Sequence, residues 1–328
     1  RYDYIETGSL VSIKKNTKDI LIPSEEHRLS LFPLDFEEFL DATGDGFTWK
    51  MIKEAFERKI PLSDAVHRQV MRTFRLYMAV GGMPQAVQAY IDTNNLGAVD
   101  RIKREIIRLY VDDFRKIDGS GFAGNIFKSI PSELSRNASR YSVSNVTKNG
   151  RSRNVSSLLA DMADSFCVNV AVHANDPNVG FSLNANPERF KLFALDTGIF
   201  ISLAFSDKDY TENTIYDSLL SDKLSVNLGY VYENIVSQQL VCAGNTLFYY
   251  TMQSESSHHL YEVDFLISRQ NKICPIEVKS SNYRNHKSLD FFAEKYASRI
   301  TQKYVIHTKN FKVENDVIYL PVYMASFL

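Results

Sequence analysis

The amino-acid sequence predicts a multidomain α/β protein. At 328 residues the chain is longer than most single domains, and its hydrophobic (44%) and charged (23%) contents are ordinary for a globular protein. Apolar residues recur at spacings of three and four through residues 48–117, which predicts helices. From residue 206 onward helical and strand-like stretches alternate, which is typical of a mixed sheet flanked by helices. We place domain boundaries after residues 47, 124 and 205.

Composition limits the classes of partner and compartment. The net charge of −1 provides no global basic field, so any nucleic-acid surface must be a local basic patch. Cys167, Cys242 and Cys274 are scattered, which indicates a reducing cytoplasm and neither a disulfide framework nor a zinc site. No apolar run approaches the length of a membrane span and no signal peptide is visible. We therefore expect a cytoplasmic protein without a membrane partner.

The most informative stretch is a predicted hairpin over residues 261–267 and 273–279. Apolar and charged side chains alternate in both arms, so each strand should bury one face and present charge on the other. If residues 269–272 form the turn, Asp264 lies opposite Glu277. The register of this hairpin therefore decides whether the two carboxylates meet.

The same register places Glu262 opposite Lys279. Mg²⁺ takes oxygen ligands, usually one or two carboxylates completed by water and substrate phosphate. A metal held there can neutralise charge on a phosphodiester, and Lys279 could position or help deprotonate the attacking water. The pattern predicts a Mg²⁺ or Mn²⁺ site. The alternative is an ordinary solvated strand face, and Glu262 either supports the ligands or only pairs with Lys279.

The pattern Asp264–x12–Glu277-Val278-Lys279 resembles the PD-(D/E)xK nucleases, the restriction-endonuclease-like superfamily. The resemblance implies a restriction-endonuclease-like mixed sheet over residues 206–328. It also implies that Asp264, Glu277 and the backbone carbonyl of Val278 bind the metal and that Lys279 is catalytic. In that superfamily a preceding helix often adds a carboxylate, and Glu233 in the predicted helix before the hairpin would supply it.

Residues 1–47 suggest the end of a nucleotide-binding core. Residues 2–9 have the pattern of a buried strand that ends in a Thr-Gly-Ser turn. This resembles the last part of an AAA+ ATPase core, where Thr7 and Ser9 would sense the terminal phosphate; the alternative is an ordinary strand-to-loop transition. The motif G-x-x-x-x-G-K-[ST] is absent, so we expect ATP binding only in a longer protein, of which this chain, beginning at Arg1, is a fragment.

Residues 48–124 predict a helical lid. The stretch Phe74–Val87, interrupted by Gly81-Gly82-Met83-Pro84, is similar to the lid of a bacterial and archaeal AAA+ family whose C-terminal domain has long been described as of unknown function. The similarity continues through residues 109–117 to the chain end. AAA+ relatives often assemble into rings, so the resemblance also implies a homo-oligomer.

Residues 125–205 predict a winged-helix domain, with helical stretches near 126–134 and 155–163 followed by strands near 166–172 and 190–195. No acidic residue occurs between positions 135 and 160. That segment instead carries the basic residues Arg136, Arg140, Lys148, Arg151 and Arg153. Such residues could contact DNA phosphates, and the alternative is a solvated face on a protein-binding module.

The sequence therefore favours an AAA+ ATPase-associated, metal-dependent DNA nuclease whose winged helix places the duplex. A second hypothesis is an ATP-regulated DNA- or protein-binding module that retains a catalytically silent nuclease fold. A third is a purely structural interaction protein. Only the first requires all of Asp264, Glu277 and Lys279 to converge.

Overall fold

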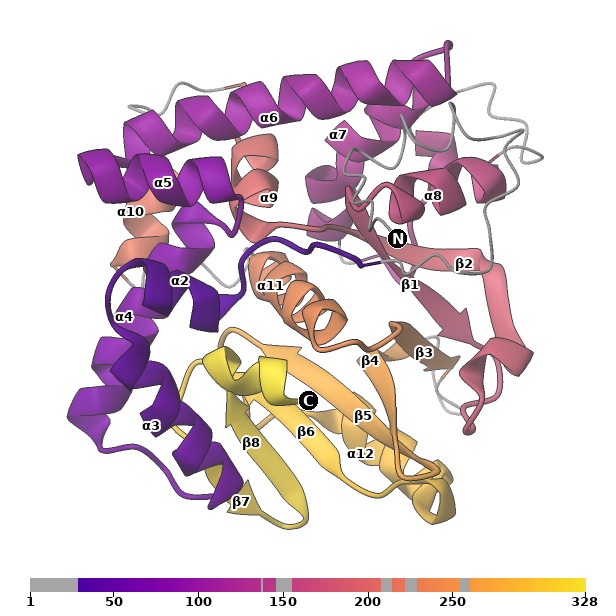
Figure 1. The fold of residues 1–328 in the computed structure, drawn as a ribbon. Coiled ribbons are helices and arrows are strands. Elements are labelled where there is room, and N and C mark those ends of the chain that lie inside the picture. The colour runs from indigo at the N-terminus through magenta and orange to yellow at the C-terminus, as the bar shows by residue number, and fades with distance from the viewer. Residues whose placement is uncertain (1–28, 137, 146–154, 208–213, 222–228, 254–259) are drawn as a thin grey trace, which may run out of the picture.

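The computed structural model describes residues 29–136, 138–145, 155–207, 214–221, 229–253 and 260–328. It combines an N-terminal helical region with an eight-stranded mixed sheet that carries further helices (Figure 1). None of the helices in these ranges has the length and apolar character that a membrane span requires. Five residues named above as site candidates lie outside the described ranges: Thr7, Ser9, Lys148, Arg151 and Arg153.

The N-terminal helical region confirms the periodicity of the sequence. Its helices are α2 (Phe36–Ala42), α3 (Gly46–Glu57), α4 (Asp64–Val80), α5 (Pro84–Thr93) and α6 (Leu96–Ile117). Helix α4 begins after Ser63, whose side chain accepts from the backbone of Val66, and ends at Gly81. The φ angle of Gly81 is 87°, in the region that favours glycine, and Pro84 then opens α5.

The segment after α6 contains both helices and strands. Its elements are α7 (Phe122–Ser135), the short 3₁₀ helix η1 (Val143–Asn145), α8 (Val155–Asp164), β1 (Val168–Ala174), β2 (Ala185–Ala194), α9 (Thr197–Ala204) and α10 (Thr214–Leu220). Strands β1 and β2 form an antiparallel pair with a register shift between Val172 and His173. Strand β2 begins earlier than the predicted strand at 190–195. Its first half is exposed or only partly buried, so it has no apolar run from which the sequence could predict a strand.

The remaining strands extend the same sheet. They are β3 (Phe248–Gln253), β4 (Leu260–Arg269), β5 (Lys272–Lys279), β6 (Lys303–His307), β7 (Lys312–Glu314) and β8 (Val317–Pro321). The strand order is β2-β1-β3-β4-β5-β6-β8-β7. Strand β1 runs parallel to β3, so one sheet joins the segments on the two sides of residue 205.

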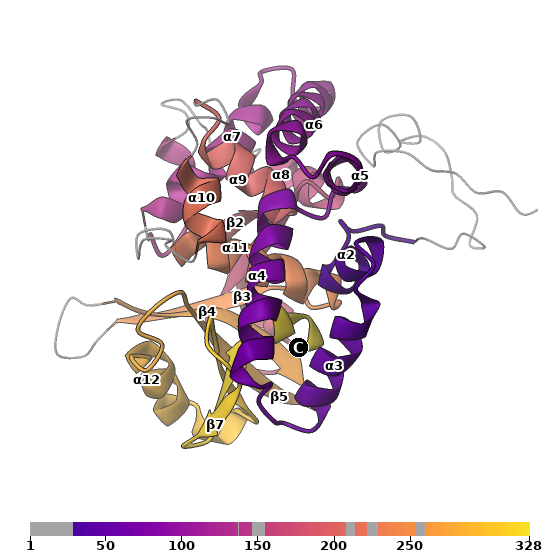
Figure 2. The ribbon, with the colours of Figure 1, turned by 90° about the vertical axis from the view of Figure 1, so that its left-hand side faces the viewer.

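Helices cover the two faces of the sheet. Helix α11 (Gly229–Cys242) crosses one face and contacts β5, β2 and β1, and α12 (Lys287–Lys295) lies on the opposite face against β4 (Figures 1 and 2). Ile235 of α11 shares a buried cluster with Phe265 and Ile276, whereas Phe292 of α12 shares another with Val263. Burial of these side chains on both faces fixes the position of the β4–β5 hairpin.

Candidate active site

The β4–β5 hairpin has the register that the sequence predicts. Its two-residue turn at 270–271 has positive φ at both positions, which matches the right-handed twist of the flanking strands. Phe265 pairs with Ile276, so Asp264 and Glu277 occupy the next pair of positions. The predicted pairing register of the hairpin is therefore confirmed.

A bulge in β4 lies at the candidate site. In the pairing with β3, Phe248 is opposite Leu266 but Tyr250 is opposite Val263, so β4 contains one extra residue between Val263 and Leu266. The strict alternation predicted for this strand is therefore wrong here: Val263 packs toward α12, and Phe265 packs toward α11. Bulges re-aim side chains, and this one lies at Asp264.

Glu277 is buried, although the sequence predicted charge on a solvated face of its strand. Its side chain is 5% exposed, and its Oε1 lies 2.6 Å from the Lys279 Nζ. Its Oε2 has no hydrogen-bond partner in the described part of the chain. Burial and the nearby Asp264 raise the pKa of Glu277 to about 8, against the opposing effect of Lys279.

Asp264 and Lys279 complete this end of the hairpin. The Val278 backbone N–H donates to Asp264 Oδ2 at 2.7 Å, so the aspartate side chain reaches across to β5 at the position beside Glu277. Burial alone would lower the pKa of Lys279, but Glu277 and Asp264 outweigh it and raise the pKa. Lys279 therefore stays charged at neutral pH.

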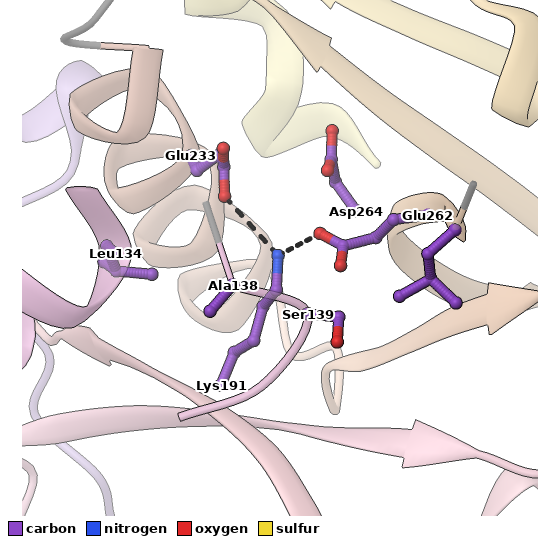
Figure 3. A pocket seen from close by; sticks show the side chains of 8 residues that line it. Leu134, Ala138, Ser139, Lys191, Glu233, Glu262 and Asp264 are labelled. Carbon is purple, nitrogen blue, oxygen red and sulfur yellow. Dashed lines mark hydrogen bonds and ion pairs between the residues drawn. The ribbon is translucent and has the colours of Figure 1, made fainter. Parts of the chain in front are cut away.

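Helix α11 carries Glu233 into the same region. The neighbouring Asn234 forms two hydrogen bonds with the backbone of Ala194 on β2, at 2.9 and 3.2 Å. These bonds hold α11 against β2 and place Glu233 close to Lys191 (Figure 3). Burial is the largest cause that raises the pKa of Glu233, to about 7, and Lys191 opposes it.

Lys191 is the functional candidate that the sequence analysis missed. From β2 its Nζ contacts the Glu262 carboxylate and lies 3.8 Å from Glu233 Oε2 (Figure 3). Burial alone would lower the pKa of Lys191, but Glu262, Glu233 and Asp264 outweigh it and raise the pKa strongly. A lysine within the apolar run of residues 190–195 is the signal that could have found it, since a buried ammonium needs a carboxylate partner.

Glu262 therefore pairs with Lys191 and does not pair with Lys279, which resolves the alternative left open by the sequence. A pocket of about 280 Å³ opens beside this pair. It is lined by Leu134, Ala138, Ser139, Lys191, Glu233, Leu260, Glu262 and Asp264. Segments from β2, α11 and β4 and the chain that follows α7 thus meet at one site (Figure 3).

The predicted basic segment borders this pocket through Ala138 and Ser139. Of its basic residues in the described ranges, Arg136 donates to the buried Glu133 at 2.6 Å, and Arg140 is exposed. Arg136 is therefore engaged in a local ion pair, and Arg140 is the better placed of the two for contact with a bound anion.

The donor set fits a hard divalent cation. Within the described ranges, no group of three or more His, Cys, Asp or Glu side chains is arranged to hold a metal by itself. Mg²⁺ needs only one or two protein carboxylates, because water and substrate phosphate complete its shell. The buried, unpartnered Glu277 Oε2 near Asp264 is an acceptor of the kind that such an ion requires.

Two family models match the chain. Residues 71–210 match a domain of unknown function (DUF8612), and residues 228–324 match another domain of unknown function (DUF4143). No curated protein and no solved structure matches. The gap between the two matches lies just beyond residue 205, where the sequence analysis placed a domain boundary. The chain is thus similar to two families whose descriptions carry no activity.

Proposed function

We propose that the protein is a metal-dependent DNA nuclease associated with an AAA+ ATPase. The observation that carries the proposal is the Glu277 carboxylate, which is buried beside Asp264, contacts Lys279 through one oxygen and leaves the other without a partner. Burying an unsatisfied carboxylate oxygen costs roughly 1–3 kcal/mol or more, and a bound cation would offset that cost.

The order of elements around the site supports the proposal. Helix α11 precedes three antiparallel strands, β3, β4 and β5, and α12 then leads to β6, which runs parallel to β5. This arrangement is similar to the core expected of restriction-endonuclease-like folds. Helices α7 and α8 with the β1–β2 pair are likewise compatible with a winged helix, which would place a duplex near the exposed Arg140.

In this proposal each residue has a separate role. Asp264, Glu277 and the Val278 carbonyl would hold the divalent cation, which when bound supplies charge neutralisation at the scissile phosphodiester. Lys279 remains protonated, so it donates hydrogen bonds to the phosphate or to the attacking water and does not act as a base. Glu233 and Glu262 hold Lys191 in place at the edge of the pocket.

Plasmid cleavage tests this proposal directly. The purified protein with Mg²⁺ or Mn²⁺ should nick supercoiled plasmid, and Lys279→Ala, Asp264→Asn and Glu277→Gln should each reduce the rate by about 100-fold or more. Lys272→Ala, which removes an exposed lysine from the same strand, is the matched control and should cleave at the wild-type rate. Intact plasmid with the wild-type protein under both metals would refute cleavage.

The second candidate is an ATP-regulated DNA- or protein-binding module with a silent nuclease fold. One observation favours it. Both lysines of the site, Lys191 and Lys279, already contact carboxylates, so neither ammonium group is free to bind a substrate phosphate. A gel shift with duplex DNA in the absence of any cleavage would favour this candidate.

A further inference from the structure

We propose that Lys191 is a resident cation that takes the place of a second metal ion, so that the site holds a single divalent cation at Asp264 and Glu277. The inference rests on the proposed function and adds the metal stoichiometry of the site. It follows from how the charged side chains in and beside the pocket are paired.

The charged groups form two sets. Lys279 Nζ contacts Glu277 at 2.6 Å, and Asp264 reaches the backbone of the same strand. In the other set, Lys191 Nζ contacts Glu262 and lies 3.8 Å from Glu233. The first set retains an unpartnered buried oxygen on Glu277, whereas the carboxylates of the second set share the Lys191 ammonium.

The position of Lys191 is fixed by its surroundings. It lies on β2, the edge strand next to β1, but its side chain is only 7% exposed. Its Nζ also lies over the ring of Tyr249, 5.6 Å from the ring centre. Displacing this ammonium would leave two carboxylates without their positive partner and would remove its contact with the aromatic ring.

Charge balance also favours one ion. Four carboxylates, from Glu233, Glu262, Asp264 and Glu277, accompany the two ammonium groups of Lys191 and Lys279. A bound cation favours the ionised form of nearby carboxylates, and with all four ionised one divalent cation matches the excess of negative charge. Paired metal ions in hydrolases lie about 4 Å apart and share their ligands, and here Lys191 already occupies the side of the pocket where Glu233 and Glu262 would bind a second ion.

Mn²⁺ binding tests the inference without reference to cleavage. Titration followed by the electron paramagnetic resonance of free Mn²⁺ should give one ion per chain for the wild-type protein. Lys191→Gln removes the charge and should raise the stoichiometry to two ions, whereas Lys191→Arg should retain one. Arg189→Gln is the matched control, because Arg189 lies on the same strand and donates to Thr251, and it forms no ion pair with a carboxylate within the described residues.

A triple variant, Lys191→Gln/Glu233→Gln/Glu262→Gln, serves as a second measurement in case Lys191→Gln alone does not fold. Its three amide side chains are neutral and can hydrogen-bond to one another. We expect it to bind one ion, at Asp264 and Glu277. Two ions in the wild-type protein, or one ion in a folded Lys191→Gln variant, would overturn the role of Lys191 alone. A wild-type protein that binds no Mn²⁺ would overturn the metal site itself, and the proposed function with it.

Discussion

Asp196 and Glu277 are both buried carboxylates, 1% and 4% exposed, but they differ in how their oxygens are satisfied. Asp196 accepts from the Gly82 N–H at 2.6 Å and from the Ile199 N–H at 2.8 Å, one bond to each oxygen. Glu277 has one oxygen on Lys279 and the other without a partner among the described residues. Fully satisfied buried groups stabilise a fold, and unsatisfied ones point to a ligand.

The Asp196 region is a junction of the fold. It contains the triplet Asp196-Thr197-Gly198. In the structure Asp196 caps α9, and the Thr197 N–H and hydroxyl both donate to Gln238 Oε1 of α11, at 2.8 and 2.9 Å. The triplet therefore ties α4, α9 and α11 together, and α11 in turn positions Glu233. Burial by itself does not separate a structural carboxylate from a functional one.

The largest effect that we predict is on stability, from Gly198→Ala. A Cβ at this position would lie 2.5 Å from the Val80 carbonyl oxygen and 2.6 Å from the Gly81 Cα. Because both neighbours are backbone atoms, the chain must shift, and we expect a loss of about 3 kcal/mol or more in the free energy of unfolding. Urea unfolding followed by circular dichroism measures this loss.

Gly119→Ala is the control for that substitution, since a Cβ there would meet nothing within 4 Å. We expect it to change the free energy of unfolding by no more than about 0.5 kcal/mol. Equal stability of the two variants would show that the close approach of residues 81 and 198 does not support the fold.

The comparison predicts opposite outcomes for two isosteric substitutions. Asp196→Asn turns one acceptor into an NH₂ group that faces a backbone donor, so it should cost about 2 kcal/mol of stability. Glu277→Gln should change stability by less than about 1 kcal/mol, because it removes a buried carboxylate of which one oxygen has no hydrogen-bond partner among the described residues. Thermal unfolding and Mn²⁺ titration of both variants separate the two roles.

In that experiment, Mn²⁺ binding should be retained in Asp196→Asn and lost in Glu277→Gln. If Glu277→Gln instead were the less stable variant and bound Mn²⁺ normally, Glu277 would be a structural residue like Asp196. That result would remove the main support for a hydrolytic site.

The local parts of the site could be predicted from the sequence, and the non-local parts could not. The register of the β4–β5 hairpin, which sets Asp264 and Glu277 at the position next to the Phe265–Ile276 pair, depends on a short turn and a period of two. Both are visible in adjacent residues. The bulge at Asp264 arises from the pairing of β4 with β3, and Lys191 reaches Glu262 from 71 residues earlier in the chain. Neither the bulge nor the Lys191–Glu262 contact produces a periodic pattern in the sequence. The lysine within an apolar strand is the one feature that indicates a buried ion pair.

The parallel pairing of β1 with β3 is another non-local contact that the sequence does not reveal. The helices and strands around it were predicted near their observed positions, but a parallel pairing between distant strands is decided by tertiary packing. The elements are therefore visible in the sequence, but the domain boundary predicted at residue 205 divides a sheet that continues across that position.

The smallest effect concerns pH and a third buried polar group, His307. Its Nδ1 accepts from the Lys309 N–H at 2.8 Å, and its Nε2 has no partner in the described ranges, so it is satisfied on one side only. Burial, together with His67 and Lys309, lowers the pKa of His307 to about 3. The unfolded chain, with a pKa near 6.5, binds more protons between these values.

Stability should therefore fall as the pH decreases from about 6.5, by up to about 1.4 kcal/mol per pH unit from this group. Burial is the main cause that lowers the pKa of His67 as well, so it adds to the same trend. His307→Asn keeps an acceptor for Lys309 and should flatten the dependence when urea unfolding is compared at pH 7 and pH 5. An unchanged slope would mean that His307 accepts a proton in the folded state and is not held neutral by its surroundings.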